Sequence, residues 1–93
     1  MEVIVTRGFQ KDLRKVPSYI QNKVGEVIAI LEKSDSLEKS GVEYKKMSGQ
    51  QKDEKYFRIR IANYRMGIEQ RKPKVIIICI MERSQIYKSF PPK

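Results

Sequence analysis

The feature that most constrains this chain is an uninterrupted apolar run near its C-terminal end, Val75-Ile-Ile-Ile-Cys-Ile-Met81. Seven residues are far too few to cross a bilayer as a helix, which takes about 20. The run contains no glycine or proline and is rich in β-branched side chains, so it predicts a buried, central β-strand. The chain has 93 residues, which predicts a single domain, residues 1–93, built around this strand.

The residues before this run show the spacings of two helices and several strands. From Phe9 to Val16 the apolar residues recur every three or four positions, which predicts a short helix ended by Pro17. The same spacing predicts a longer helix over 18–33. Alternation and turn residues predict strands at 2–6, 42–48, 56–61, 64–70 and 75–81, and a polar turn at 50–54. We therefore expect an α+β fold, with two N-terminal helices packed on one face of a twisted, mostly antiparallel sheet of four or five strands.

Positive charge is concentrated in the C-terminal part of the chain, whose net charge is +9 overall. Residues 1–54 carry 10 Lys and Arg against 9 Asp and Glu, whereas residues 55–93 carry 10 against only 2. Such an asymmetry indicates a polyanionic partner, either nucleic acid or an acidic protein. Charge that serves only solubility is the alternative, although it is more often spread evenly.

Three of these basic residues belong to a predicted hairpin. If residues 62–63 form a two-residue turn, Arg60 pairs with Arg65. Arg58 then lies on the same face, opposite Gly67, which leaves space beside it. Paired arginines repel, and a bound anion would relieve this because a guanidinium binds two phosphate oxygens at once. The alternative is a solvated basic face, and a register shift of one residue would separate the arginines. The residues expected to face the helices are Phe57, Ile59, Ile61, Tyr64, Met66 and Ile68.

The scarcity of cysteine and histidine limits the chemistry of the chain. Cys79 is the only cysteine and there is no histidine, so neither an intrachain disulfide nor a structural zinc site can form. Cys79 lies inside the apolar run, which favours a small buried side chain over a reactive thiol. We expect no metal and no cofactor. The N-terminal residues lack the basic and apolar regions of a signal peptide, so we expect a cytoplasmic protein without a membrane segment.

Four blocks spread over nearly the whole chain resemble the RelE/ParE superfamily of bacterial toxins from toxin–antitoxin pairs. The blocks are FQKDLRKVP (9–17), KKMSG (45–49), YFRIRIANYRMGIE (56–69) and VIIICIMERSQIYKSF (75–90). The resemblance implies a compact toxin with two N-terminal helices against a twisted sheet. RelE-type members enter the ribosomal A site and cut mRNA there, by attack of the 2′-hydroxyl on the adjacent phosphate. The resemblance therefore implies an endoribonuclease, an mRNA interferase that inhibits translation.

The same resemblance implies catalytic roles for five residues. Arg65 and Arg83 match family arginines and would bind phosphate. Arg58 and Arg60 match basic residues and would contact phosphate or help to polarise the 2′-hydroxyl. Tyr87 matches an aromatic residue and would stack on a base or position the nucleophile. An alternative for Tyr87 is a structural role, as an anchor that fixes the tail over the last strand.

Proton transfer has no obvious carrier in this sequence. Many family members have histidine directly before the arginine at position 83, where this chain has Glu82, and arginine stays protonated. Glu82 either acts as the acid or base or simply pairs with Arg65 or Arg83. Alternation places Glu82, not Arg83, on the arginine face. A bulge or the end of the strand is therefore needed to turn Arg83 inward.

Further contacts and partners follow from the resemblance. Other residues expected to bind the RNA backbone are Lys45, Lys46, Arg71, Lys72 and Lys74, of which the last three are alternatively a solvated turn. The implied partners are mRNA, the ribosome and a cognate acidic antitoxin. The toxin alone is expected to be monomeric and to form a higher-order complex with the antitoxin. Two other functions stay open. ParE-type toxins share the scaffold but inhibit DNA gyrase without cutting RNA, and a basic module could bind nucleic acid without catalysis.

Overall fold

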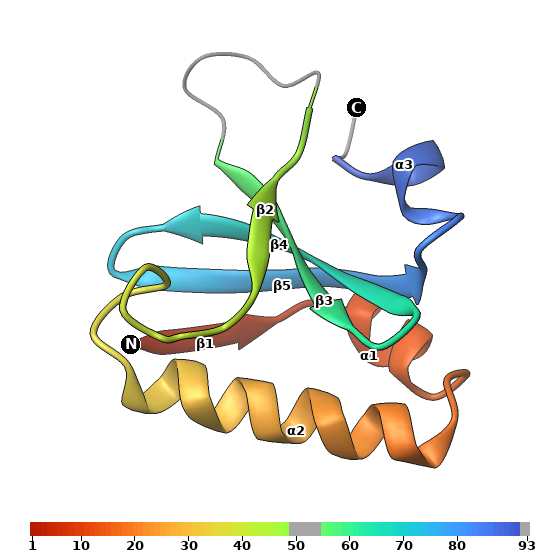
Figure 1. The fold of residues 1–93 in the computed structure, drawn as a ribbon, viewed down its shortest axis with the longest axis horizontal. Helices are drawn as coiled ribbons and strands as arrows, with labels where there is room; N and C mark the ends of the chain where they lie inside the picture. Colours follow the sequence, from red (N-terminus) through yellow and green to blue (C-terminus); the bar gives the residue numbers. More distant parts are fainter. Residues whose placement is uncertain (49–54, 92–93) are drawn as a thin grey trace.

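The computed structural model describes residues 1–48 and 55–91, so the turn expected at 50–54 lies outside the described residues. A five-stranded mixed sheet, in the order β1-β5-β4-β3-β2, forms the body of the molecule (Figure 1). The elements are β1 (Glu2–Val5), α1 (Arg7–Leu13), α2 (Ser18–Lys33), β2 (Tyr44–Lys46), β3 (Tyr56–Ile61), β4 (Tyr64–Arg71), β5 (Lys74–Glu82) and α3 (Ile86–Ser89). The predicted α+β architecture is confirmed, and the predicted central strand is β5, between β1 and β4.

Local signals set the ends of the two N-terminal helices. The Thr6 hydroxyl accepts a hydrogen bond from the Phe9 amide at 3.1 Å, so α1 begins earlier than its apolar spacing predicts. α1 also ends earlier, at Leu13; Val16 lies beyond the helix but is still buried. α2 has the predicted bounds and begins directly after Pro17. No helix of the described residues is long and apolar enough to cross a membrane.

Pairing of β5 gives the sheet its mixed character and one irregularity. β1 runs parallel to β5, whereas β2, β3, β4 and β5 pair antiparallel. Gly67 of β4 pairs with Cys79 of β5, but the next residue, Ile68, pairs with Ile77. Ile78 is thus the extra residue of a β-bulge. From Cys79 onward, the bulge changes which side chains of β5 lie on each face of the sheet.

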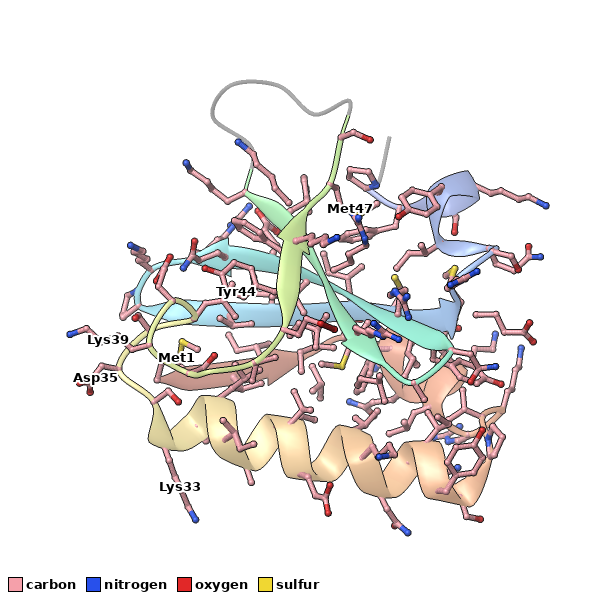
Figure 2. The ribbon with its side chains drawn as sticks, in the orientation of Figure 1. Met1, Lys33, Asp35, Lys39, Tyr44 and Met47 are labelled. Carbon is pink, nitrogen blue, oxygen red and sulfur yellow. The ribbon has the colours of Figure 1, made fainter. Side chains whose placement is uncertain are left out.

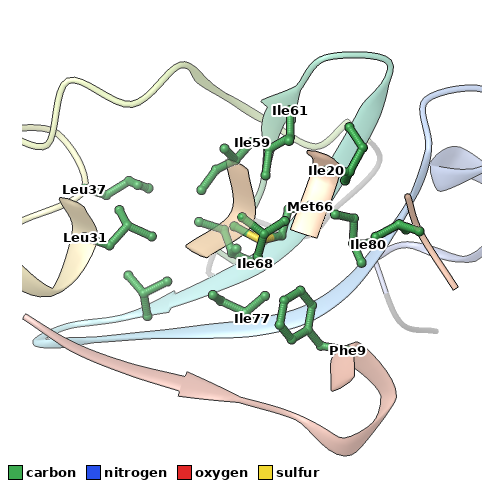
Figure 3. Packing of buried hydrophobic residues seen from close by; sticks show 13 residues of the cluster. Phe9, Ile20, Leu31, Leu37, Ile59, Ile61, Met66, Ile68, Ile77 and Ile80 are labelled. Atoms are coloured by element: carbon green, nitrogen blue, oxygen red, sulfur yellow. The ribbon is translucent and has the colours of Figure 1, made fainter. Parts of the chain in front are cut away.

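The main core lies between the helices and one face of the sheet (Figure 3). Phe9 of α1 and Ile20 and Leu31 of α2 pack with strand side chains such as Ile59 and Ile77. The residues predicted to face the helices do so, since Ile59, Ile61, Met66 and Ile68 are buried in this core and Phe57 and Tyr64 pack against it. The opposite face, which α1 and α2 leave uncovered, is called the outer face below.

A second, smaller core lies on the outer face, where the C-terminal segment folds back onto the sheet. Its buried members are Met47, Cys79, Ile86 and Phe90. Burial raises the pKa of the Cys79 thiol to about 11, so the thiol is protonated at neutral pH. Cys79 is therefore a small buried side chain, as its place in the apolar run predicts.

Candidate functional site

The β3–β4 hairpin brings three arginines together on the outer face. Arg60 pairs with Arg65 directly across the ladder, and Arg58 pairs with Gly67, in the predicted register. The turn begins at Ala62, whose φ of 54° lies in the left-handed region and costs an alanine about 1–2 kcal/mol. Residues that face each other on neighbouring strands share one face. The two-residue turn thus fixes a cluster of positive charge on the face that α1 and α2 leave uncovered.

These arginines line a cavity of about 500 Å³, called the arginine pocket below. Its walls come from the edge strand β2, the β3–β4 hairpin and the segment that follows β5. The lining residues are Glu43, Tyr44, Lys45, Arg58, Arg60, Arg65, Arg83, Ser84 and Tyr87. Figure 2 shows Tyr44 on β2, with Met47 further along the chain toward the C-terminal segment. Five cations and one carboxylate therefore share a space large enough for a small ligand.

Arg65 is fixed at the inner side of the pocket by its own hairpin. Its Nη1 donates to the carbonyl oxygens of Ala62 at 2.9 Å and Tyr64 at 2.8 Å. Partial burial lowers the pKa of the Arg65 guanidinium, and the nearby charges of Arg60 and Arg83 lower it further. Arginine nevertheless stays protonated. The result is a pre-positioned cation whose charged form is less strongly favoured than that of a free arginine.

Tyr87 lies at the pocket with its ring over Arg58. The Arg58 guanidinium carbon is 5.3 Å from the ring centroid, in the range of a cation–π contact. Arg58 also donates from Nη1 to the carbonyl of Lys46 at 3.3 Å. Tyr87 is 56% exposed, whereas its neighbours Ile86 and Phe90 are buried. The structural anchors of the tail are thus Ile86 and Phe90, and Tyr87 itself faces the pocket.

The bulge in β5 reverses the expected positions of Glu82 and Arg83. Met81, rather than Glu82, lies opposite Arg65, and Glu82 pairs with Tyr64 on the other face. Among the described residues Glu82 forms no ion pair, so the expected pairing with Arg65 or Arg83 is wrong. β5 ends at Glu82, and Arg83 turns into the pocket while its amide donates to the Asn63 carbonyl at 3.0 Å. The bulge, one of the two features that the sequence analysis expected to be needed, therefore places Arg83 at the arginine pocket.

Glu43 is a pocket residue that sequence reasoning missed. Its Oε2 lies 3.8 Å from Nη1 of Arg60, and both side chains are more than half exposed. It is the one carboxylate that lines the pocket among the described residues. The sequence does carry a signal, because Glu43 and Lys45 alternate and Lys45 pairs with Arg58. That signal could be used only if the pairing of β2 with β3 were known.

The other predicted RNA contacts divide between the two ends of the sheet. Lys45 lines the pocket, but Lys46 pairs with Phe57 and does not line it. Arg71, Lys72 and Lys74 lie at the turn between β4 and β5, at the opposite end of β4 from the arginine hairpin. This set of three is called the basic turn below.

The space expected beside Arg58 at Gly67 is filled. A Cβ built on Gly67 would lie 2.7 Å from the Cys79 sulfur and 3.0 Å from two ring carbons of Phe90. The Phe90 ring thus packs directly on the backbone of Gly67. The missing side chain admits another residue of the protein rather than a ligand.

Comparison with known proteins shows to which family the chain belongs. The family described as ParE toxin of type II toxin–antitoxin system, parDE, matches residues 3–87. Toxin RelE3 of Methanocaldococcus jannaschii is 35% identical over 91 residues, which cover 98% of this chain and 100% of that protein. The chain belongs to the RelE/ParE family of toxins of type II toxin–antitoxin systems. This finding confirms the resemblance seen in the sequence.

Solved structures of RelE/ParE toxins share the fold. The RelB–RelE antitoxin–toxin complex from Methanococcus jannaschii aligns with a TM-score of 0.78 and 33% identity, over 95% of this chain and 99% of that one. The intact RelBE toxin–antitoxin complex of E. coli aligns with a TM-score of 0.58 and 19% identity, over 87% and 94% of the two chains, and shows the fold alone. The chain is thus a RelE-family toxin of a toxin–antitoxin pair.

Proposed function

We propose that this RelE-family toxin is a ribosome-dependent endoribonuclease, which cuts mRNA by attack of a 2′-hydroxyl on the adjacent phosphate. The observation that carries the proposal is the arginine pocket, where four arginines, the carboxylate of Glu43 and the phenol of Tyr87 line one cavity. Charge stabilisation and proton transfer are the two requirements of this reaction. A toxin that only binds DNA gyrase needs cationic surface but no carboxylate within it.

The arginines supply the charge stabilisation. Attack by the 2′-oxygen places extra negative charge on the phosphorus oxygens, and release of the 5′-oxygen leaves a 2′,3′-cyclic phosphate. Arg65 and Arg83 bind these oxygens, with Arg58 and Arg60 beside them. Their mutual repulsion falls when the phosphate binds, and falls further as charge develops. Lys45 holds the neighbouring backbone phosphate.

Glu43 and Tyr87 supply the proton transfers in this proposal. The Glu43 carboxylate takes the proton of the 2′-hydroxyl, because the cationic lining residues have no free lone pair to accept it. Tyr87 gives its phenolic proton to the leaving 5′-oxygen, and the cation of Arg58 under its ring stabilises the resulting phenolate. Glu82, which lies outside the pocket, has no part in the reaction.

The partners follow from the same site. The toxin works in the cytoplasm, where mRNA and ribosomes are, and needs neither metal nor cofactor for this reaction. A cognate antitoxin with an acidic segment neutralises the arginine pocket in a higher-order complex. The support is that RelE relatives were crystallised with RelB antitoxin. Free of antitoxin, the toxin is a monomer.

The test is a translation reaction with purified toxin and ribosomes carrying a defined mRNA. We expect a cut at the codon in the A site, mapped by primer extension, with a 2′,3′-cyclic phosphate end and only on the ribosome. Glu43→Gln should lower the single-turnover rate by about 10²–10⁴-fold. Glu26→Gln, which changes an exposed carboxylate on α2, is the matched control and should cut normally.

A parallel supercoiling assay with DNA gyrase separates the alternatives. Intact A-site mRNA together with loss of supercoiling would show a ParE-type inhibitor and reject the nuclease. Binding of RNA without cutting and without an effect on gyrase would show a non-catalytic binding module instead.

A further inference from the structure

The contact that the Tyr87 side chain makes with Arg58 does not by itself account for the position of Tyr87 at the pocket. Tyr87 is 56% exposed, and the specific contact of its side chain within residues 1–48 and 55–91 is the cation–π contact with Arg58. α3 has only four residues and no side-chain cap at its N-terminus. Helices this short are not stable by themselves. The position of Tyr87 must therefore be set by packing of the residues on either side of it.

Those residues are the most buried part of the C-terminal segment. Ile86 is 0% and Phe90 is 3% exposed, and both belong to the small core on the outer face. The Phe90 amide donates to the Ile86 carbonyl at 2.9 Å, which closes the turn that contains Tyr87. The Phe90 ring meets the Tyr56 ring edge-on, with centroids 5.5 Å apart. Tyr87 is thus carried between two fixed points.

Phe90 reaches its place because position 67 has no side chain. A Cβ at Gly67 would lie 3.0 Å from Cδ1 and Cε1 of Phe90, closer than such atoms normally approach. Gly67 also pairs with Arg58 across the β3–β4 ladder. The backbone that receives Phe90 and the arginine that lies under Tyr87 therefore occupy the same rung of the sheet. Packing of Phe90 on Gly67 therefore sets the distance between the C-terminal segment and the arginine pocket.

We propose that Phe90 and Gly67 are positioning residues, whose contact holds Tyr87 over Arg58 and in reach of the bound RNA. The step that uses Tyr87 rests on the proposed nuclease function, but the contact itself does not. Loss of the contact frees the tail while Arg58, Arg60 and Arg65 stay in place, because the hairpin holds them independently. The expected defect is thus in the rate of cutting rather than in binding of the RNA.

The test follows Tyr87 directly, by ¹⁹F NMR of the full-length toxin labelled with 3-fluorotyrosine. The chain has 5 tyrosines, and the Tyr87 signal is the one lost in Tyr87→Phe. Phe90→Ala and Gly67→Ala should both move the Tyr87 signal toward that of a solvent-exposed fluorotyrosine. Val24→Ala, which removes core methyl groups on the other face of the sheet, should leave it unchanged.

Activity of the same variants supplies the second measurement. Phe90→Ala should lower the single-turnover cutting rate by about 10–100-fold with little change in the affinity for ribosome-bound mRNA. In a Tyr87→Phe background, Phe90→Ala should have little further effect, because both changes remove the same group from the reaction. Phe90→Leu keeps an apolar side chain on Gly67 and should restore most of the rate.

The outcomes are distinct. An unchanged Tyr87 signal in Phe90→Ala and in Gly67→Ala would overturn the proposal, as would rate losses that simply multiply with that of Tyr87→Phe. If the Tyr87 signal moves but even the unaltered toxin does not cut mRNA, the positioning contact stands and the nuclease function fails. Gly67→Ala removes no apolar contact, but its Cβ would also press on the buried Cys79 sulfur, 2.7 Å away. Circular dichroism must therefore show that both variants are folded, and Phe90→Leu, which adds no atoms at Gly67, tests the contact without overpacking.

Discussion

The arginine pocket at one end of the sheet holds five cations and one carboxylate, whereas the basic turn at the other end holds three cations close to two carboxylates. In the pocket, the recorded ion pair is the 3.8 Å contact of Arg60 with Glu43. At the basic turn, Arg71 pairs with Glu69 at 2.9 Å and Lys72 lies 4.0 Å from Glu38. Both ends of the sheet are rich in basic residues, but at the basic turn two of the three cations lie beside a carboxylate, whereas in the pocket one of the five does.

The difference shows in the pKa directions of the two arginines. Hydrogen bonding to Glu69 raises the pKa of Arg71, so its charge is already stabilised. Burial and then the neighbouring arginines lower the pKa of Arg65, so its charged form is less favoured than that of a free arginine. An anion should therefore bind more favourably at the arginine pocket, where most of the cations lack a neighbouring carboxylate among the described residues, than at the basic turn. Uncompensated charge, rather than charge density, is what distinguishes the candidate site.

The largest expected effect is a difference in mRNA cutting between a variant of the arginine pocket and a variant of the basic turn. Arg65→Ala should lower mRNA cutting by at least about 100-fold, because it removes a fixed cation from the developing phosphate charge. The protein should remain folded, since the side chain bonds only the carbonyls of its own turn among the recorded contacts. Arg71→Ala is the matched control and should cut within a few-fold of the unaltered toxin. Circular dichroism checks the fold, and an unfolded Arg65→Ala protein would give this residue a structural role.

A smaller effect concerns the salt dependence of RNA binding. Each unpaired cation that contacts a backbone phosphate contributes roughly 0.7 to the slope of log affinity against log salt for a single strand. Lys45→Ala should lower that slope by about this amount, whereas Lys72→Ala should change it less because Glu38 is near. Fluorescence anisotropy with a short RNA at several salt concentrations measures both. Equal slopes for the two variants would remove the proposed difference between the ends.

Stability should respond with opposite signs at the two ends. Arg83→Gln removes a charge that repels Arg65 and should raise the free energy of unfolding slightly. Arg71→Gln removes the partner of Glu69 and should lower it slightly. Urea unfolding of both variants under the same low-salt conditions provides the comparison. A loss of stability in Arg83→Gln would mean that the pocket cations are not under repulsion.

The smallest effect is a pH dependence at the basic turn. The amide of Gln70 donates to Glu38 at 3.1 Å, and this bond is the main cause that lowers the pKa of Glu38 below its ordinary value of 4.5. A lowered pKa adds stability that is present above pH 4.5 and is lost as the pH falls through the folded-state value. Glu38→Gln should therefore flatten the stability profile below pH 4.5. Acid titrations followed by circular dichroism would detect this, and an unchanged profile would contradict it.

How well the sequence predicts the fold and the site depends on how far apart the paired residues lie along the chain. Arg60 and Arg65 are joined by a two-residue turn, so alternation alone sets their pairing. Glu43 directly precedes β2, which pairs with β3 across a longer connection whose length does not fix the register, so the place of Glu43 in the pocket was not predictable. The bulge at Ile78 lies inside a uniform apolar run, where no side chain marks it, and it moved Glu82 off the arginine face. The packing of Phe90 on Gly67 depends on the tail folding back, which local patterns do not encode.

The parallel pairing of β1 with β5 has a consequence for how the toxin is made. The Thr6 hydroxyl donates to the Ile78 carbonyl at 3.0 Å, between residues 72 positions apart. β1 is synthesised before β5, so this pairing cannot form until β5 has been made, and contacts of such high sequence separation form slowly. Arg83 and Tyr87 emerge later still. A nascent chain therefore carries the hairpin arginines before the residues that complete the arginine pocket have been made.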